Sequence, residues 1–379
     1  MPHVSLSMIV KDEAETLPRI LGDARSFCDE MIIVDTGSSD GTSEIAVEAG
    51  AKVIHTPWTD DFSEARNISL EACTGDWIVW LDADDRIPVS SQQEFSRIIA
   101  GLGDDVDVVA TPYHLRFNED GGCMESSVRE RMLRRAANLR WSGTIHESVD
   151  MRGIPSARVR AEPTLIVEHR PPAAKAYRDP GRNLRIIEKA YTAGDRSIRL
   201  LYHRASEFQV KGWHGEAIAA YREALEALET ERSACSCPAG ITACSPSFLS
   251  YFSLFSLAQS LIALDRNGEA VEVALKAIHI TPVRPEAWMA AGVAHFNQKN
   301  YELASPFFSA ATQARKRPPL GPLHDIDYSW APWDYLSSCL GAIGRYEEAL
   351  SAGNRALSGN PDKGRVQKNL DDWAAALRQ

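Results

Sequence analysis

Two acidic residues separated by a single residue, Asp82 and Asp84, follow an apolar run at residues 77–81. A hard divalent cation that is bound to a diphosphate takes oxygen ligands, and one or two carboxylates are enough because phosphate and water complete the shell. An acidic pair of this spacing at the end of a strand could therefore contact a metal ion and a ribose. The same spacing occurs in solvated turns and helix caps, so the pair alone leaves both interpretations open.

Three apolar segments of the N-terminal region predict β-strands that end at polar residues. Residues 4–10, 31–34 and 77–81 precede Lys11-Asp12-Glu13, Asp35-Thr36-Gly37 and Asp82-Ala83-Asp84, respectively. Helical patterns at residues 13–27, 41–50 and 62–73 separate these strands and a further strand at residues 51–55. Such alternation indicates right-handed βαβ units and a parallel sheet. Because ligands of these sheets bind beyond the carboxyl ends of the strands, we expect the three polar groups to line one crevice.

Residues 105–170 differ in character, since short strand patterns at residues 106–112, 131–135 and 165–167 have few helical segments between them. This pattern indicates the mixed second half of an α+β domain. The Pro-, Ala- and Arg-rich residues 171–183 are expected to lead out of that domain.

The C-terminal half has a repeating helical pattern. Residues 212–225, 266–277, 300–311 and 344–357 share Gly/Asn-x-x-x-Glu-Ala or a close variant, and Ala270 and Ala304 lie 34 residues apart. That distance is the period of tetratricopeptide repeats (TPRs), each of which buries its apolar face against its neighbours. The uncharged residues 248–264 are interrupted by serines about three positions apart, so we expect a buried repeat helix rather than a stable membrane insertion.

The charge and the cysteines limit the classes of partner and the compartment. The formal net charge is −11 over 379 residues, which disfavours nucleic acid as a partner because a polyanion would be repelled. The N-terminal residues lack the basic and apolar regions of a signal peptide. Seven cysteines, an odd number, fit reduced thiols better than a disulfide framework, so we expect a cytoplasmic protein.

Four ordered motifs together resemble family-2 glycosyltransferases with a GT-A fold: SMIVKDEAETLPRIL, IIVDTGSSDGTSEIA, HTPWTDDFSEARNISLEACTGDWIVWLDADD and WSGTIHESV. With the repeats, the chain is similar to the subgroup that includes glycocin-type peptide S-glycosyltransferases. The resemblance implies an α/β GT-A (nucleotide-diphospho-sugar transferase) domain followed by an all-α TPR-like solenoid. We expect the GT-A domain at residues 1–172, a linker with a helix at 173–197 and the repeats at 198–379.

The resemblance also implies a nucleotide-sugar site. Its expected residues are Val10, Lys11, Glu13, Asp35, Gly37, Arg66, Asp82 and Ala83. Asp35 could accept a hydrogen bond from a uracil-type N–H, and the planar guanidinium of Arg66 suits phosphate oxygens. The alternative for Arg66 is a surface salt bridge with Asp60, Asp61 or Glu64.

The implied metal ligands are Asp84, His169 and Asp82, with Mn²⁺ or Mg²⁺ as the cofactor. A neutral imidazole can bind Mn²⁺, although it is a softer ligand than Mg²⁺ prefers. The alternative is that His169 is a solvated histidine at a strand end. Here Arg170-Pro171-Pro172 stands where the family often has an aromatic-glycine-tyrosine run.

His146 and Glu147 match the acceptor-side motif of the family. Inverting transfer needs a base that takes the proton of the attacking acceptor. A carboxylate in a closed crevice can have its pKa raised toward neutrality, so Glu147 is the expected base and His146 would orient it or contact the sugar phosphate. Alternatively, Glu147 only caps a loop and another acid serves.

The predicted reaction is inverting transfer of a sugar from a nucleotide-diphosphate donor, a UDP-sugar in particular, to a peptide, protein or glycan acceptor. The repeats would bind the acceptor or pair two copies of the chain as a homodimer. One alternative is a sugar nucleotidyltransferase, which normally has a basic, glycine-rich loop where this chain has the acidic Ile-Val-Lys-Asp-Glu. The other is a non-catalytic TPR scaffold with a nucleotide-sugar-binding domain.

Overall fold

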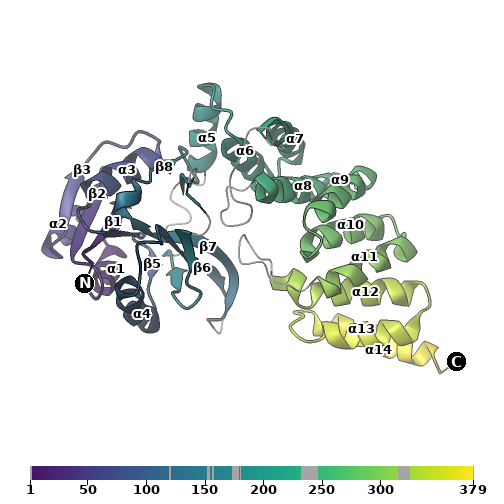
Figure 1. Ribbon diagram of the computed structural model, residues 1–379. Helices are drawn as coiled ribbons and strands as arrows, with labels where there is room; N and C mark the ends of the chain where they lie inside the picture. Colours follow the sequence, from purple (N-terminus) through teal and green to yellow (C-terminus); the bar gives the residue numbers. More distant parts are fainter. Residues whose placement is uncertain are drawn as a thin grey trace. The chain divides into compact units, whose positions relative to one another are not determined.

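The computed structural model of the chain (Figure 1) describes residues 2–118, 121–151, 154–155, 158–172, 179, 181–231, 246–314 and 325–378. Contacts within these residues divide the chain between Leu200 and Leu201 into two compact units. The first unit contains a mixed β-sheet and the second consists of helices. The predicted order of an α/β domain followed by helical repeats is therefore confirmed, whereas the boundaries at residues 172 and 197 remain predictions.

The first half of the sheet is parallel, as the alternating pattern predicts. Its elements are β1 (Val4–Val10), α1 (Leu17–Ala24), β2 (Glu30–Asp35), α2 (Thr42–Glu48), β3 (Lys52–His55), α3 (Phe62–Ala72) and β4 (Trp77–Trp80). β1 pairs in parallel with β2 and with β4, and β2 pairs in parallel with β3. The carboxyl ends of these strands therefore lie along one edge of the sheet.

Side-chain alternation along β1 separates the two faces of the sheet. Leu6, Met8 and Val10 lie in the apolar cluster that also contains the buried residues of α1. Ser7 points to the opposite face, where its hydroxyl donates to Ser69 Oγ on α3 at 2.8 Å. The sheet is thus covered by helices on both faces, and α3 is held against the face that carries the polar contact.

The second half of the sheet is mixed. Its elements are β5 (Asp85–Arg86), α4 (Val89–Ala100), β6 (Val108–Phe117), β7 (Cys123–Arg134), η1 (Arg135–Ala137), β8 (Trp141–Ser142), β9 (Ser148–Val149), β10 (Val159–Ala161) and β11 (Val167–His169). The main sheet has the order β3-β2-β1-β4-β7-β6-β11-β5, with β10 added beside β6, while β8 and β9 pair separately. β7 runs antiparallel to β4 and β6. The patterns predicted at residues 106–112 and 131–135 thus correspond to the longer strands β6 and β7, whereas the pattern at residues 165–167 overlaps β11 only at Val167.

A β-bulge in β7 changes the direction of one side chain. Val109 of β6 is paired with Met132, but the next residue, Ala110, is paired with Glu130. Arg131 is the extra residue between them, and its side chain is fully buried. Bulges are frequent next to functional sites because they redirect a side chain out of the regular alternation.

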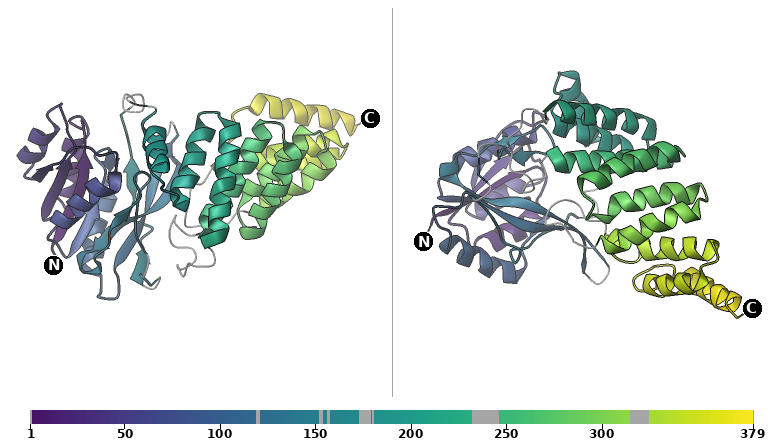
Figure 2. Two further views of the ribbon diagram at one scale, coloured as in Figure 1. Left: turned by 90° about the horizontal axis from the view of Figure 1, so that it is seen from above. Right: turned by 45° about the vertical axis from the view of Figure 1, so that its right-hand side comes forward.

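The second unit is a stack of consecutive helices (Figure 2). After α5 (Arg182–Thr192) in the first unit come α6 (Ile198–Val210), α7 (His214–Glu231), α8 (Pro246–Ala263), α9 (Asn267–Ile280), α10 (Pro285–Asn297), α11 (Tyr301–Gln313), η4 (Asp325–Tyr328), α12 (Ala331–Ala342), α13 (Tyr346–Ala356) and α14 (Lys363–Ala376). Each helix from α7 to α14 packs against the next one in the chain. The repeat alanines Ala270, Ala304 and Ala349 are completely buried.

The uncharged segment at residues 248–264 forms most of α8. Its serines face neighbouring helices rather than solvent, because Ser250, Ser253 and Ser260 are all buried. In the part of the chain that the structure describes, no helix has the length and apolar character needed to cross a membrane.

Close packing between α10 and α11 yields a test of the repeat core. A Cβ atom on Gly292 would lie 2.6–2.9 Å from ring atoms of Phe308, and Phe308 is completely buried. We expect Gly292→Ala to lower the free energy of unfolding of the helical unit by about 1–3 kcal/mol, because overpacking outweighs the gain of up to ~1 kcal/mol in helix propensity.

Gly268 of α9 is the matched control, since a Cβ atom there would have no neighbour within 4 Å. Denaturant unfolding followed by circular dichroism measures both variants. Equal midpoints for Gly292→Ala and Gly268→Ala would show that the α10–α11 contact is looser than described.

Candidate functional site

Hydrogen bonds join the segments that follow β1 and β2. The amide of Asp12 donates to Ser38 Oγ at 3.0 Å, and the carboxylate of Asp12 accepts from the amide of Ser39 at 2.8 Å. The amide of Glu13 donates to Thr42 Oγ1 at 2.8 Å. Two of the three strand-end segments that the sequence brings into one site are therefore in direct contact.

Asp35 shapes the turn that follows β2. Its Oδ1 accepts from the amides of Gly37 at 2.9 Å and Ser38 at 2.8 Å, and its Oδ2 accepts from the hydroxyl of Ser43. Burial alone would raise the pKa of Asp35, but these hydrogen bonds outweigh it and lower the pKa. Gly37 has a φ of +105°, a conformation that favours glycine. The predicted contact of Asp35 with a nucleobase remains a prediction.

The other predicted nucleotide-sugar residues near these turns differ in exposure. Val10 and Ala83 are buried, Glu13 is buried and accepts from Thr16 Oγ1 at 2.8 Å, and Lys11 is exposed. Lys11 therefore presents its charge to solvent at the end of β1, whereas the other three contribute to the packing of the edge.

Arg66 on α3 forms a buried ion-pair network. Its Nη2 donates to Asp82 Oδ1 at 2.7 Å, and its Nε donates to Glu147 Oε1 at 2.6 Å. The guanidinium also lies 5.0 Å from the ring centre of Trp80 and 4.9 Å from that of Trp141. The structure thus brings together three residues that the sequence predicts for the site, from positions up to 81 residues apart.

The surface alternative for Arg66 is not observed, because its described ion pairs are those with Asp82 and Glu147. Asp61 instead caps α3 by accepting from the amide of Glu64 at 3.0 Å, and Asp60 pairs with Lys189 at 2.6 Å. Arg66 is consequently held inside the domain by two carboxylates.

The expectation that the pKa of Glu147 is raised is wrong for this arrangement. Burial of Glu147 does raise its pKa, but the neighbouring charge of Arg66 and the hydrogen bond from it outweigh burial, and the net pKa is lowered. The same competition lowers the pKa of Asp82, where burial is outweighed by Arg66, Arg131 and Arg129. Both carboxylates are therefore ionised at neutral pH.

The segment that carries His146 and Glu147 is fixed by the end of the first unit. Ile145 packs against Ile186 and Ile187 of α5. The carbonyl oxygen of His146 accepts from Arg199 Nε at 2.6 Å. The helix predicted within residues 173–197 thus supports the predicted catalytic segment directly.

A second acidic group lies where β5 pairs with β11. Ligand atoms of Asp84, Asp85 and His169 all lie within 4.8 Å of one another, and His169 is opposite Asp85 in the strand pairing. The distances from His169 Nδ1 are 3.6 Å to Asp84 Oδ1 and 3.8 Å to Asp85 Oδ1. Burial disfavours the protonated form of His169, but Asp85 and Asp84 outweigh it and raise its pKa.

This group could hold a divalent metal ion. His169 Nδ1 is buried and has no hydrogen-bond partner among the described residues, and carboxylate oxygen is the ligand that Mn²⁺ and Mg²⁺ share. Asp84 and His169 were predicted ligands, and they lie together as expected. Asp82, the third predicted ligand, lies outside this group and is paired with Arg66.

Asp85 is a site residue to which the sequence analysis assigns no role. It is completely buried, and its Oδ2 accepts from the amide of Asp82 at 2.9 Å. Its Oδ1 accepts from the hydroxyl of Tyr113 at 2.8 Å, and its Oδ2 pairs with Arg131 Nη1 at 3.1 Å. Asp85 thus holds the acidic turn in place. Its position as a third acid in Asp82-Ala83-Asp84-Asp85 was the only signal of this in the sequence.

Arg131, the bulged residue of β7, completes this support. Its guanidinium lies 3.9 Å from the ring centre of Trp80 and 4.3 Å from that of Tyr113. Nη1 also donates to the carbonyl oxygen of Trp80 at 3.2 Å. The last residue of β4 and the acid that braces the following turn are therefore held by one side chain.

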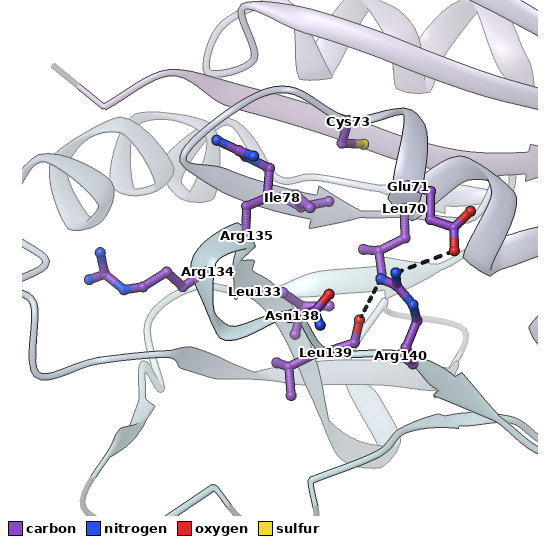
Figure 3. Close-up of a pocket in the computed structure, with 10 residues that line it drawn as sticks. All are labelled: Leu70, Glu71, Cys73, Ile78, Leu133, Arg134, Arg135, Asn138, Leu139 and Arg140. Carbon is purple, nitrogen blue, oxygen red and sulfur yellow. Dashed lines mark hydrogen bonds and ion pairs between the residues drawn. The ribbon is translucent and has the colours of Figure 1, made fainter.

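A cavity elsewhere in the domain does not include these residues. Figure 3 shows it between the C-terminal end of α3 and the neighbouring ends of β4 and β7, where Leu70, Ile78 and Leu133 line it. Arg140 lies there and pairs with Glu71 at 3.3 Å. The cavity lies toward the amino end of β4, whereas the acidic turn follows the carboxyl end of that strand.

Comparison with protein families agrees with both units. Residues 5–153 match the glycosyl transferase family 2, and residues 285–317 match a tetratricopeptide repeat. A TPR repeat-containing protein of Synechococcus elongatus is 41% identical over 175 residues, which are 45% of this chain and 42% of that protein. The glycosyltransferase SunS of Bacillus subtilis is 28% identical over 149 residues, 38% of this chain and 34% of SunS.

Both matches span less than half the length of the relative. Among solved structures, glucosyl-3-phosphoglycerate synthase of Mycobacterium tuberculosis is similar at 23% identity and a TM-score of 0.26, over 30% of this chain and 44% of that one. The chain therefore contains a family-2 glycosyltransferase domain, with a GT-A-like mixed sheet, followed by tetratricopeptide repeats.

Proposed function

We propose that the chain transfers a sugar, with inversion, from a nucleotide-diphosphate sugar of the UDP type to a peptide, protein or glycan acceptor. The observation that carries this proposal is the joining of Asp82 and Glu147 by Arg66. Arg66 thereby holds both Asp82, which is in the acidic turn after β4, and Glu147, which is the candidate base. The match of residues 5–153 to a glycosyltransferase family supports the class of reaction.

In the proposed reaction, the acceptor attacks the anomeric carbon as the bond from that carbon to the diphosphate breaks. The acceptor's proton moves to the Glu147 carboxylate, and the nucleoside diphosphate leaves with the bonding electrons. Because the pKa of Glu147 is lowered, the carboxylate is in its proton-accepting form at neutral pH. Arg66 orients it, since Nε of Arg66 donates to Oε1 of the carboxylate.

Asp84 and His169 would hold Mn²⁺ or Mg²⁺, which supplies positive charge for the departing diphosphate. Asp85 would brace this pair from behind, because its oxygens already bind Tyr113, Arg131 and the amide of Asp82. The repeats would bind the acceptor or a second copy of the chain, as helical-repeat surfaces commonly bind extended partners.

The donor can be identified by thermal unfolding of the full chain with Mn²⁺ and a panel of nucleotide sugars. A ligand at 100 times its Kd adds about 2.7 kcal/mol of stability to the folded state. Product analysis then distinguishes the reaction classes, because transfer releases a nucleoside diphosphate and nucleotidyl chemistry releases pyrophosphate.

Asp84→Ala is expected to remove metal-dependent hydrolysis of the donor, by roughly 100-fold or more, because a buried carboxylate ligand is lost. Release of nucleoside diphosphate is measured with and without Mn²⁺. Asp105→Ala is the matched control, since it removes the same charge from an exposed loop position. Negligible turnover and no donor binding in both wild type and Asp84→Ala would indicate a non-catalytic scaffold.

Glu147→Gln is expected to lower kcat by about 10²- to 10⁴-fold, because the proton acceptor is lost. The amide oxygen can still accept from Arg66, so the affinity for the nucleoside diphosphate should remain that of the wild type. Steady-state kinetics and calorimetric titration measure the two quantities. Wild-type kcat in Glu147→Gln would assign the base to another acid.

A further inference from the structure

Three guanidinium groups surround the indole of Trp80 at the end of β4. Those of Arg66, Arg129 and Arg131 lie 5.0, 5.3 and 3.9 Å from its ring centre. Arg129 and Arg131 both belong to β7, which is the neighbour of β4 in the sheet. Positive charge is therefore concentrated beside the strand that leads to the acidic turn.

Two of these arginines are neutralised by the protein itself. Arg66 is paired with Asp82 and Glu147, and Arg131 is paired with Asp85. These contacts use carboxylates at 2.6–3.1 Å, so neither guanidinium has a free charge to offer to a ligand.

Arg129 differs from both. Within the described residues its side chain forms no ion pair and no hydrogen bond; its Nε is buried without a partner, as are Nε and Nη2 of Arg131, but Arg131 has a carboxylate partner and Arg129 has none. The side chain as a whole is only half-buried, so part of it can be reached from solvent. An arginine whose N–H groups lack acceptors inside a protein is stabilised by an anionic ligand that supplies them.

The location of Arg129 is that of the proposed reaction. Its guanidinium lies against the same indole as that of Arg66, which is paired with Asp82 and Glu147. Two further polar atoms on the segment of Glu147, Trp141 Nε1 and Thr144 Oγ1, are also buried without a hydrogen-bond partner. Trp141 packs against the same indole as Arg129, with ring centres of Trp141 and Trp80 4.8 Å apart. Arg129 and Trp141, each with an unused donor, thus both lie against Trp80.

We propose that Arg129 binds the anionic oxygens of a substrate, namely the diphosphate of the nucleotide donor. This inference rests on the proposed function. It adds a second positive charge, the guanidinium of Arg129, to that of the metal ion. The charges of a diphosphate and Asp84 together exceed those of one divalent cation, and a guanidinium supplies both positive charge and paired N–H donors. An acidic group of the acceptor has the same chemistry and is the other source that the experiment separates.

The test compares wild type, Arg129→Gln and Arg129→Lys by calorimetric titration with UDP and with uridine, in the presence of Mn²⁺. Loss of a charge-assisted contact predicts that Arg129→Gln binds UDP about 10- to 100-fold more weakly, with Arg129→Lys intermediate and uridine affinity unchanged. Arg116→Gln is the matched control, because Arg116 is exposed on the adjacent strand β6 and pairs with Glu125 at 2.6 Å. Thermal unfolding checks that all variants are folded.

A second titration adds inorganic phosphate to the protein saturated with UDP and Mn²⁺. Unchanged UDP affinity together with loss of phosphate binding in Arg129→Gln would support an anion site that takes the acceptor's acidic group, and would overturn the diphosphate assignment. Unchanged affinity for both probes would overturn the anion site altogether. A wild-type protein that binds no nucleotide would overturn the proposed function itself. Equal binding of UDP by the wild type and by Arg129→Gln would instead overturn only the role of Arg129 in binding the diphosphate.

Discussion

The burial of Arg66 constrains the whole candidate site. A guanidinium cannot remain in an interior without carboxylates to pair with it, and the structure provides two, from the turn after β4 and from the segment before β9. One side chain therefore fixes helix α3, the turn after β4 and the residues near Glu147 relative to one another. The aromatic rings of Trp80 and Trp141 cover this cation and limit its access to water.

A second buried ion pair, between Asp85 and Arg131, holds the acidic turn that follows β4. Asp85 binds the amide of Asp82 and the hydroxyl of Tyr113, so the turn is held from below while Asp84 remains directed toward His169. The three acids of the turn differ in their partners. Asp82 belongs to the arginine network, Asp85 to the support, and Asp84 with His169 to the group that can hold a cation.

The local patterns of the sequence were sufficient for the parallel half of the sheet and for the helical unit. Alternating strands and helices predicted the parallel half of the sheet, and β1 was predicted at the residues it occupies. The position of polar residues after β1, β2 and β4 predicted which edge carries the site, because parallel strands share that edge. The repeat spacing predicted the helical unit, whose alanines are buried between helices. Each of these features depends on residues close together in the chain.

The electrostatics of the site could not be predicted in the same way, because they depend on contacts between distant segments. The direction of the pKa shift of Glu147 is set by Arg66, 81 residues away, and burial considered alone gives the opposite sign. Arg131 reaches Asp85 only because a bulge in β7 adds one residue to that strand, and no short motif announces a bulge. Arg129 lies two positions before Arg131. The nearby carboxylates already pair with Arg66 and Arg131, so Arg129 is left without a carboxylate partner. The proposed places for the phosphate and for the metal ion therefore rest on two features: a guanidinium that has no carboxylate partner among the described residues, and a buried imidazole nitrogen that has no hydrogen-bond partner there.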